Sequence, residues 1–351
     1  MSTLQKTAPS SLPLPNLVDV RVIQATYVSA FAIVHGLALF ALLPWFFSWA
    51  GVVAFWGGVV VFGQLGIPVC YHRQLTHRSF RTPKWLERTF VVFAMCSAQD
   101  TPAKWVAWHR KHHGHSDEQE DPHTPLVNFL WSHIGWMCVK NRSLSTVAFY
   151  QKYARDILED PFYMFLERHW LSIAWIYLGH ALFYFLVSWA VAIGVYGNND
   201  EALQLALSLL VWGVLLRSVY VWHITWSVNS LTHLFGYRNF DTDDNSRNNW
   251  FVAVLTGGEG WHNNHHADQT AASVQTRWWE IDLNYYIIKL LERVGLATDV
   301  VPLHRERRRG GDPLVSLMVD RGFTNTTTPP QTEVRSVAAP LKSEPPEMLV
   351  S

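Results

Sequence analysis

The sequence predicts an all-α membrane protein, in which four transmembrane helices form two hairpins and a helical cap lies on one side of the membrane. Two observations support this fold class: long stretches of the chain have no charged residue, and histidines gather in three short polar segments. Eight of the 17 histidines lie in these segments, namely His72, His77, His109, His112, His113, His262, His265 and His266.

The charge-free stretches define the predicted spans. Residues 22–71 contain no Asp, Glu, Lys or Arg over 50 positions, and one transmembrane helix needs about 20 residues. Two helices therefore fit, with a turn near Pro44 and Trp45. Residues 170–199 form a second charge-free stretch, and residues 202–237 form a third that is interrupted only by Arg217. The four predicted spans cover residues 22–43, 49–71, 170–196 and 202–226.

The distribution of basic residues predicts the orientation. The loops near Pro44 and Asn198 contain no Lys or Arg, whereas the other connecting segments carry nearly all of them. By the positive-inside rule, both termini and all three histidine clusters are expected on the cytoplasmic side. The membrane domain is predicted over residues 18–321, and disordered tails are predicted over residues 1–17 and 322–351, which are rich in Pro, Ser and Thr.

The second and fourth helices are expected to project beyond the membrane. To carry histidines to the cap, they must run from about Trp49 to His77 and from about Ala202 to His233. At 1.5 Å per residue each would be roughly 40 to 45 Å long, which exceeds the hydrocarbon core of about 30 Å. We also expect Trp131 and Trp136, in a short apolar segment, to lie at the membrane interface.

The spacing of the histidines indicates metal binding. The pattern His-x-x-His-His occurs twice, and residues at i, i+3 and i+4 share one face of a helix, so each pattern can aim three imidazoles at one point. Eight imidazoles exceed what one four- to six-coordinate ion uses, which predicts two ions held close together. His72 and His77 lie about 140° apart on a regular helix, so we expect them to reach different ions. The alternative, unrelated core or surface histidines, does not account for a repeated pattern.

Four segments carry a family resemblance. They are His72-Arg-Gln-Leu-Thr-His-Arg-Ser-Phe80, His109-Arg-Lys-His-His113 followed by Asp121-Pro-His123, Asn229-Ser-Leu-Thr-His-Leu-Phe-Gly236, and Gly258-Glu-Gly-Trp-His-Asn-Asn-His-His266. In this order and spacing they resemble the integral-membrane fatty acyl desaturases, and most closely the Δ9, stearoyl-CoA-desaturase-like group. The resemblance covers roughly residues 20 to 300.

The resemblance implies a centre of two iron ions held by nine histidines, which are the eight clustered ones and His233. Asn229 matches the family position that reaches one iron through a water molecule. Gln99, Trp105, Thr225 and Trp226 match positions that line the bend of the substrate tunnel. Beyond the ligands, Glu259, Asp121 and Asp268 flank the clusters and are expected to orient imidazole N–H groups. His115, His123, His133 and His223 are expected to support the metal ligands or the fold without binding a metal ion themselves.

The implied reaction suits a substrate that ordinary acid–base groups cannot attack. An unactivated methylene has no acidic proton, and the family removes two hydrogens from adjacent carbons with O₂ and two electrons, leaving a cis double bond at Δ9 and releasing water. The acyl chain is carried on CoA or on a glycerolipid. Basic residues that face CoA in the animal enzymes are replaced by Ala107 and Asn141, with Lys140 nearby, so both carriers stay open.

The chain contains no haem-binding His-Pro-Gly-Gly and no Gly-x-Gly-x-x-Gly, so an external donor of the ferredoxin or cytochrome b5 type is expected to supply electrons. Membrane lipid is an expected partner, and nucleic acid is not. Gln64 is polar within the second span and is expected to face the closed end of the tunnel. Two other functions remain open: a related membrane di-iron hydroxylase or ketolase, and a metal transporter, whose ligands would lie near the membrane midplane.

Overall fold

The computed structural model describes residues 11–169 and 171–304 and is mostly helical. The predicted tail over residues 322–351 and the first ten residues of the N-terminal tail lie outside the described residues. The elements in the first half of the chain are β1 (Val18–Ile23), α1 (Ala25–Ala38), η1 (Leu39–Leu42), η2 (Pro44–Phe46), α2 (Trp49–Gly58), η3 (Val59–Thr76), α3 (Lys84–Met95), α4 (Pro102–His115), η4 (Trp131–Gly135), α5 (Trp136–Cys138), β2 (Val139–Asn141), η5 (Arg142–Leu144), α6 (Val147–Tyr153), α7 (Arg155–Leu158) and α8 (Pro161–Arg168).

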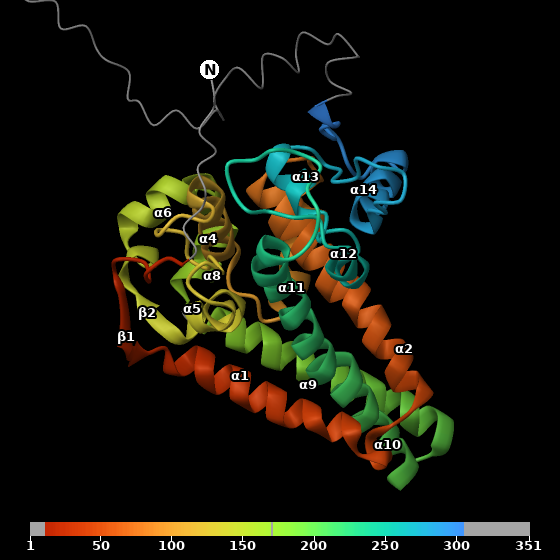
Figure 1. The fold of residues 1–351 in the computed structure, drawn as a ribbon. Helices are drawn as coiled ribbons and strands as arrows, with labels where there is room; N and C mark the ends of the chain where they lie inside the picture. The colour runs from red at the N-terminus through yellow and green to blue at the C-terminus, as the bar shows by residue number, and fades with distance from the viewer. Residues whose placement is uncertain (1–10, 170, 305–351) are drawn as a thin grey trace, which may run out of the picture. The chain divides into compact units, whose positions relative to one another are not determined.

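The elements in the second half are α9 (Ser172–Tyr196), α10 (Asp200–Leu210), η6 (Val211–Leu216), α11 (Arg217–Leu234), α12 (Trp250–Thr256), α13 (His262–Ala267) and α14 (Leu283–Arg293). The helices α1, α2, α9, α10 and α11 form one part of the described fold (Figure 1). The helices α4, α5, α6, α8, α12, α13 and α14 gather at the end where η3 and α11 finish.

Four helices are long and apolar enough to cross a membrane, as the charge-free stretches predicted. They run over Ala25–Leu42, Trp49–Thr76, Ser172–Tyr196 and Asp200–Leu234. The second has 28 residues and the fourth 35, more than the roughly 20 that a span needs, so both extend toward the short helices. The side chains of α1 and α9 are largely exposed and apolar, which suits contact with hydrocarbon.

The second long helix changes its hydrogen bonding partway along its length. After α2, which Ser48 caps by accepting a hydrogen bond from the Gly51 N–H, the helix continues as η3 with π-helical i→i+5 bonding. A π-helix is wider than an α-helix and is often found at functional sites. The pattern reaches the end of the helix, where the His77 N–H donates to the His72 carbonyl at 3.1 Å.

Gly66 marks a close approach between η3 and α3. A Cβ atom on Gly66 would lie 2.6 Å from the Ala94 backbone nitrogen and 2.7 Å from its Cα, contacts that the backbone must move to relieve. We therefore expect Gly66→Ala to destabilise the protein by about 1 to 3 kcal/mol, measured as a lower midpoint of thermal unfolding in detergent. Gly57→Ala is the matched control, because nothing lies within 4 Å of its added Cβ, and a similar loss in both variants would contradict the expectation.

The prediction of an all-α fold was wrong in one detail. β1 and β2 form a two-stranded antiparallel sheet in which Val18 pairs with Asn141 and Asp19 with Lys140. The strands join segments more than 100 residues apart, and β2 has only three residues, too few to show an alternating pattern. Of the predicted N-terminal tail, residues 11–17 are described, and the Leu12 N–H donates to the Leu126 carbonyl at 2.9 Å.

Candidate metal centre

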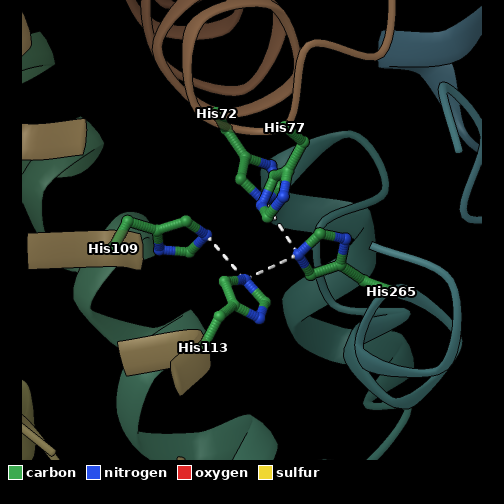
Figure 2. A group of neighbouring side chains, drawn as sticks. All are labelled: His72, His77, His109, His113 and His265. Atoms are coloured by element: carbon green, nitrogen blue, oxygen red, sulfur yellow. Dashed lines mark hydrogen bonds between the residues drawn. The ribbon is translucent and has the colours of Figure 1, made fainter. Parts of the chain in front are cut away.

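The nine predicted histidines lie together in two neighbouring groups. The ligand atoms within each group lie within 4.8 Å of one another. The first group contains His72, His77, His109, His113 and His265, and the second contains His112, His233, His262 and His266. Figure 2 shows the first group, with imidazoles converging from η3, α4 and α13.

Each His-x-x-His-His pattern divides between the two groups, which corrects the expectation that its three imidazoles aim at one point. On α4, His109 and His113 belong to the first group and His112 to the second; on α13, His262 and His266 belong to the second and His265 to the first. The cause is helical geometry. At 100° per residue, positions i and i+4 lie about 40° apart, but positions i+3 and i+4 lie about 100° apart. One short helix therefore serves two adjacent sites.

His72 and His77 lie in the same group, although a regular α-helix would point them in different directions. The prediction assumed a regular α-helix, in which residues five apart point in different directions. The hydrogen bond from the His77 N–H to the His72 carbonyl closes a π-helical turn, and in such a turn residues five apart point in more similar directions than in an α-helix. Their ring centroids are 4.8 Å apart.

Imidazole nitrogens within each group approach one another closely. In the first group, Nε2 of His265 lies 3.1 Å from Nε2 of His72 and 3.1 Å from Nε2 of His113. In the second group, Nε2 of His262 lies 3.1 Å from Nε2 of His233. Burial, reinforced by neighbouring imidazoles, lowers the pKa of His109, His113, His262 and His265 well below the usual range. These rings are therefore neutral and have a lone pair available for a metal ion.

Four histidines donate their Nδ1 hydrogen to a carboxylate. The Nδ1 atoms lie 2.6 Å from Glu259 for His72, 2.9 Å from Asp121 for His112 and 3.0 Å from Asp117 for His233; His266 pairs with Asp244. With Nδ1 protonated, each Nε2 keeps its lone pair.

Of these carboxylates, Glu259 and Asp121 were predicted from the sequence. Asp117 was missed although it lies only four residues after His113, and Asp244 lies in a loop that no motif marks. Asp268, the third predicted partner, accepts a hydrogen bond from the His304 backbone N–H at 2.7 Å.

Arg73 anchors one of these carboxylates. Its guanidinium is buried and donates to Glu259 at 2.6 Å, to Asp282 at 2.9 Å and to the Ala272 carbonyl at 2.7 Å. Burial raises the pKa of the Glu259 carboxyl, but Arg73 and His72 outweigh burial and hold this pKa well below its usual range. Glu259 is therefore an anion that joins η3 to the segment before α13.

The two groups are chemically suited to cations. The Nε2 atoms of His77 and His266, one in each group, are buried and have no hydrogen-bond partner among residues 11–169 and 171–304. An unpartnered buried nitrogen is costly unless a ligand satisfies it. Imidazole suits iron, zinc, copper and nickel alike, so the donor set indicates a metal site without selecting the metal.

Other predicted residues lie around the groups. His123 is buried beside Asp121 and His112, and His115 pairs with Glu118 at 3.0 Å. His133 and His223 contact each other, with Nε2 of His133 2.9 Å from Nδ1 of His223. None of these four belongs to the two groups that contain the nine predicted ligands.

Two neighbouring cavities lie beside the first group. The first takes in about 580 Å³ and the second about 560 Å³, in each case including space that is open to solvent. Their linings share Trp105, His109, Thr225 and Asn229. Asn229 therefore faces both cavities, and so do the predicted substrate residues Trp105 and Thr225.

The remaining predicted substrate residues line one cavity each. Gln99 and Trp226 line the second cavity, and Nε2 of Gln99 donates to the Thr225 hydroxyl at 2.9 Å. Gln64 lines the first cavity. Trp131 and Trp136 are 7% and 6% exposed, so both are buried within the protein; their expected depth at the membrane interface stays a prediction.

Comparison with known proteins gives consistent matches. The model of the family described as fatty acid desaturase matches residues 47–291. An sn-1 stearoyl-lipid 9-desaturase of Anabaena variabilis is 45% identical over 267 residues, which is 75% of this chain and 88% of the relative. An sn-1 stearoyl-lipid 9-desaturase of Synechocystis sp. is 41% identical over 275 residues, 78% of this chain and 79% of the relative. An acyl-CoA 5-desaturase of Anemone leveillei is 40% identical over 295 residues, 83% and 84% of the two chains.

Proposed function

The chain belongs to the fatty acid desaturase family, and from that premise we propose that it inserts a cis double bond at Δ9 into the acyl chain of a glycerolipid at a centre of two iron ions. The fatty acyl substrate and the membrane character follow from the family and from the four apolar helices. The position of the double bond, the lipid carrier and the iron are the proposed parts. The observation that carries the proposal is the pair of histidine groups beside two cavities that share four lining residues.

In this proposal His72, His77, His109, His113 and His265 hold one iron, and His112, His233, His262 and His266 hold the other. Asn229 reaches an iron through a water molecule. A reduced iron pair supplies the O₂ chemistry that removes hydrogen from unactivated carbon. The carboxylates Glu259, Asp117, Asp121 and Asp244 fix the ring orientations, and 10- to 100-fold losses in metal affinity or activity are typical when such partners are removed.

The cavities give the acyl chain its path. The chain passes Trp105 and Thr225, where the two cavities share a wall with His109. Successive methylenes are chemically alike, so their position relative to this wall selects the bond. The Gln99 amide donates a hydrogen bond to the Thr225 hydroxyl, which fixes the positions of both side chains in this wall. The apolar lining of the first cavity, including Val59, Ile67 and Ile224, excludes water from the reacting carbons.

A glycerolipid carrier is supported by two observations. The relatives at 45% and 41% identity are named for stearoyl chains in lipids. In this chain Ala107 is fully buried, and Asn141 is buried and accepts a hydrogen bond from the Ser143 N–H. Neither residue offers a cation to the phosphates of CoA.

The proposal also includes the orientation of the protein in the membrane. The four helices form two hairpins, with both termini and the metal centre on the cytoplasmic side, because the basic residues lie outside the two short loops between helices. An external donor of the ferredoxin or cytochrome b5 type supplies the electrons.

Expression in a desaturase-deficient host tests the reaction. The glycerolipids should gain Δ9-monounsaturated chains, located by derivatisation and mass spectrometry, and these should be absent from an empty-vector control. Hydroxylated or oxidised chains would instead favour the related hydroxylase or ketolase. Transport of metal into liposomes with no change in lipid would favour a transporter.

Gln64 provides a test of chain length. It lines the first cavity, and its Nε2 atom lies 2.8 Å from the position of a Cβ built on Gly257, so it occupies space between η3 and the end of α12. We expect Gln64→Ala to shift the product profile toward longer chains, measured as the ratio of 18-carbon to 16-carbon monoenes. Gln204→Ala is the control, since Gln204 is bonded to the Trp45 carbonyl and lines neither cavity. An unchanged profile in Gln64→Ala would remove Gln64 from this role.

A further inference from the structure

Two helices on either side of the third histidine cluster carry exposed apolar faces. In the chain, α12 precedes the histidines of α13 and α14 follows them. The buried face of α12 consists of Val252, Ala253 and Thr256, and its exposed face consists of Trp250, Phe251 and Val254. α12 contains no charged residue, and Val254 is 70% exposed. An apolar face of this kind marks a surface that contacts a membrane or another protein.

The exposed face of α14 is an apolar stripe with basic side chains beside it. Leu283, Tyr286 and Leu290 are exposed, and their spacing of i, i+3 and i+7 places them on one face. At 100° per residue, Lys289 and Arg293 lie next to this stripe, and both are exposed. A helix that lies in the surface of a bilayer has this pattern, with apolar side chains in the lipid and cations at the head-group phosphates.

Two contacts place the end of α12 at the depth of the predicted membrane spans. The Tyr220 hydroxyl donates to the Leu255 carbonyl at 3.1 Å, and Tyr220 lies six residues before residue 226, where the predicted fourth span ends. Six residues correspond to about 9 Å along the helix, and interfacial helices insert their apolar face by roughly 5 to 10 Å. Gln64, inside the predicted span over residues 49–71, has its Nε2 atom 2.8 Å from the position of a Cβ built on Gly257.

The exposed face of α12 continues the apolar surface of the second membrane helix. The Tyr220 ring lies 5.7 Å from the Trp56 ring between centroids, and Trp56 is an exposed residue of that helix. The start of α14 is bound to the end of α12, because the Asn284 backbone N–H donates to the Gly257 carbonyl at 3.2 Å and its Nδ2 atom to the Thr256 carbonyl at 3.1 Å. α12 packs against α11, and α14 packs against η3 (Figure 1).

We infer that the exposed faces of α12 and α14 insert into the bilayer leaflet on the side of the metal centre, with Lys289 and Arg293 at the phosphates of anionic head groups. This inference rests on the membrane arrangement in the proposed function, because the depth is counted from the predicted spans. A bilayer is favoured over a protein partner by the continuity with the second membrane helix and by the basic side chains beside the stripe. Insertion holds the histidines of α13 beside the lipids that carry the substrate.

Fluorescent labels on single introduced cysteines test this placement. The full-length protein carries Cys138→Ser, because Cys70 and Cys96 are buried, and it is reconstituted in liposomes of phosphatidylcholine and phosphatidylglycerol. A nitrobenzoxadiazole label is attached in Val254→Cys or in Leu290→Cys. Lipids with a nitroxide on the acyl chain quench labels in the leaflet, whereas iodide quenches labels in water. Both labels should be quenched several-fold more by the lipid nitroxide than by iodide.

Three further labelled sites calibrate this measurement. Leu182→Cys, at an exposed position of the third membrane helix, gives the value for lipid. Asp241→Cys, whose native side chain is 99% exposed, gives the value for water. Lys289→Cys is the matched control on α14, because it lies beside the stripe and should be quenched more by iodide than Leu290→Cys. All of these sites are on the surface, so labelling should leave the fold intact.

Two results would overturn the inference. Labels in Val254→Cys and Leu290→Cys that behave like Asp241→Cys would show that the two faces lie in water. Labels that neither quencher reaches would show that protein covers the faces, for which a second copy of the chain is the available partner in these liposomes.

Product analysis of the same variants separates this inference from the proposed function. Normal desaturation and a lipid-quenched Leu182→Cys, together with iodide-quenched labels on α12 and α14, would overturn the insertion and leave the function intact. A Leu182→Cys label quenched by iodide would contradict the membrane arrangement and the inference together. Lipid-quenched labels on α12 and α14 in a chain that forms no unsaturated product would support the insertion and count against the proposed reaction.

Discussion

Replacing His265 with alanine is expected to abolish desaturation and to remove about half of the bound metal. His265 has a central place in the first group, since its Nε2 lies 3.1 Å from Nε2 of both His72 and His113. Its loss leaves the nitrogens of η3 and α4 without the ligand that faces them from α13. The four histidines of the second group are unchanged, which is why part of the metal should stay. Iron per chain is measured by elemental mass spectrometry, and product by lipid analysis.

His115→Ala is the control for this variant. His115 is also on α4, but it pairs with Glu118 at 3.0 Å and belongs to neither group. Normal iron and product are expected. Full iron and activity in His265→Ala would contradict its assignment as a ligand.

Glu259→Gln is expected to weaken metal binding by 10- to 100-fold, the usual effect of removing a carboxylate that orients a ligand. The change removes the charge that holds the Nδ1 hydrogen of His72 and leaves Arg73 with Asp282 as its nearest anion. The protein should also unfold at lower temperature, because breaking a buried ion pair costs about 3 to 5 kcal/mol when one partner is lost. Glutamine keeps a hydrogen bond, so the loss of stability should lie at or below the lower end of this range.

Competition with a metal chelator measures the first effect, and thermal unfolding in detergent measures the second. Asp160→Asn is the matched control: Asp160 pairs with Arg88 at 3.1 Å and caps α8, so its variant should keep normal metal affinity. A chelator midpoint in Glu259→Gln equal to that of the wild type would show that Glu259 does not support the metal site.

The four membrane helices could be predicted because their signal is compositional. A long stretch without charged residues can be recognised from the sequence alone. The length of the second and fourth helices followed from the need to bring His72 and His233 to one place. The two-stranded sheet could not be predicted, because β2 offers only three residues and pairs with a strand more than 100 positions away.

The sequence analysis predicted which nine histidines gather, but not how they divide between the two groups. Spacing shows which residues share a face, but it assumes the helix type. The π-helical turn that brings His72 and His77 into one group departs from the regular α-helix on which the prediction was based. Asp244 was missed for a similar reason, since its contact with His266 joins a loop to α13 through the tertiary fold.

Trp136 shows that burial in lipid and burial within the protein are hard to tell apart from the sequence of a membrane protein. A tryptophan in a short apolar segment predicts an anchor at the membrane interface. The same pattern is found in the protein interior, because lipid and protein interiors are both apolar. The structure places Trp136 in the wall of the second cavity, against Trp108 and His123. Only the tertiary contacts separate an indole that faces lipid from one that is buried within the protein.

Desaturation of an intact labelled lipid is the most direct test of the central claim. The iron-loaded protein is reconstituted in liposomes with a glycerolipid that carries deuterated stearate at sn-1 and ¹³C in its glycerol, together with a reduced ferredoxin. We predict a product that keeps both labels and has lost two deuterium atoms across C9 and C10. Labelled product that appears only when stearoyl-CoA is supplied, or oxidation without a double bond, would contradict the account.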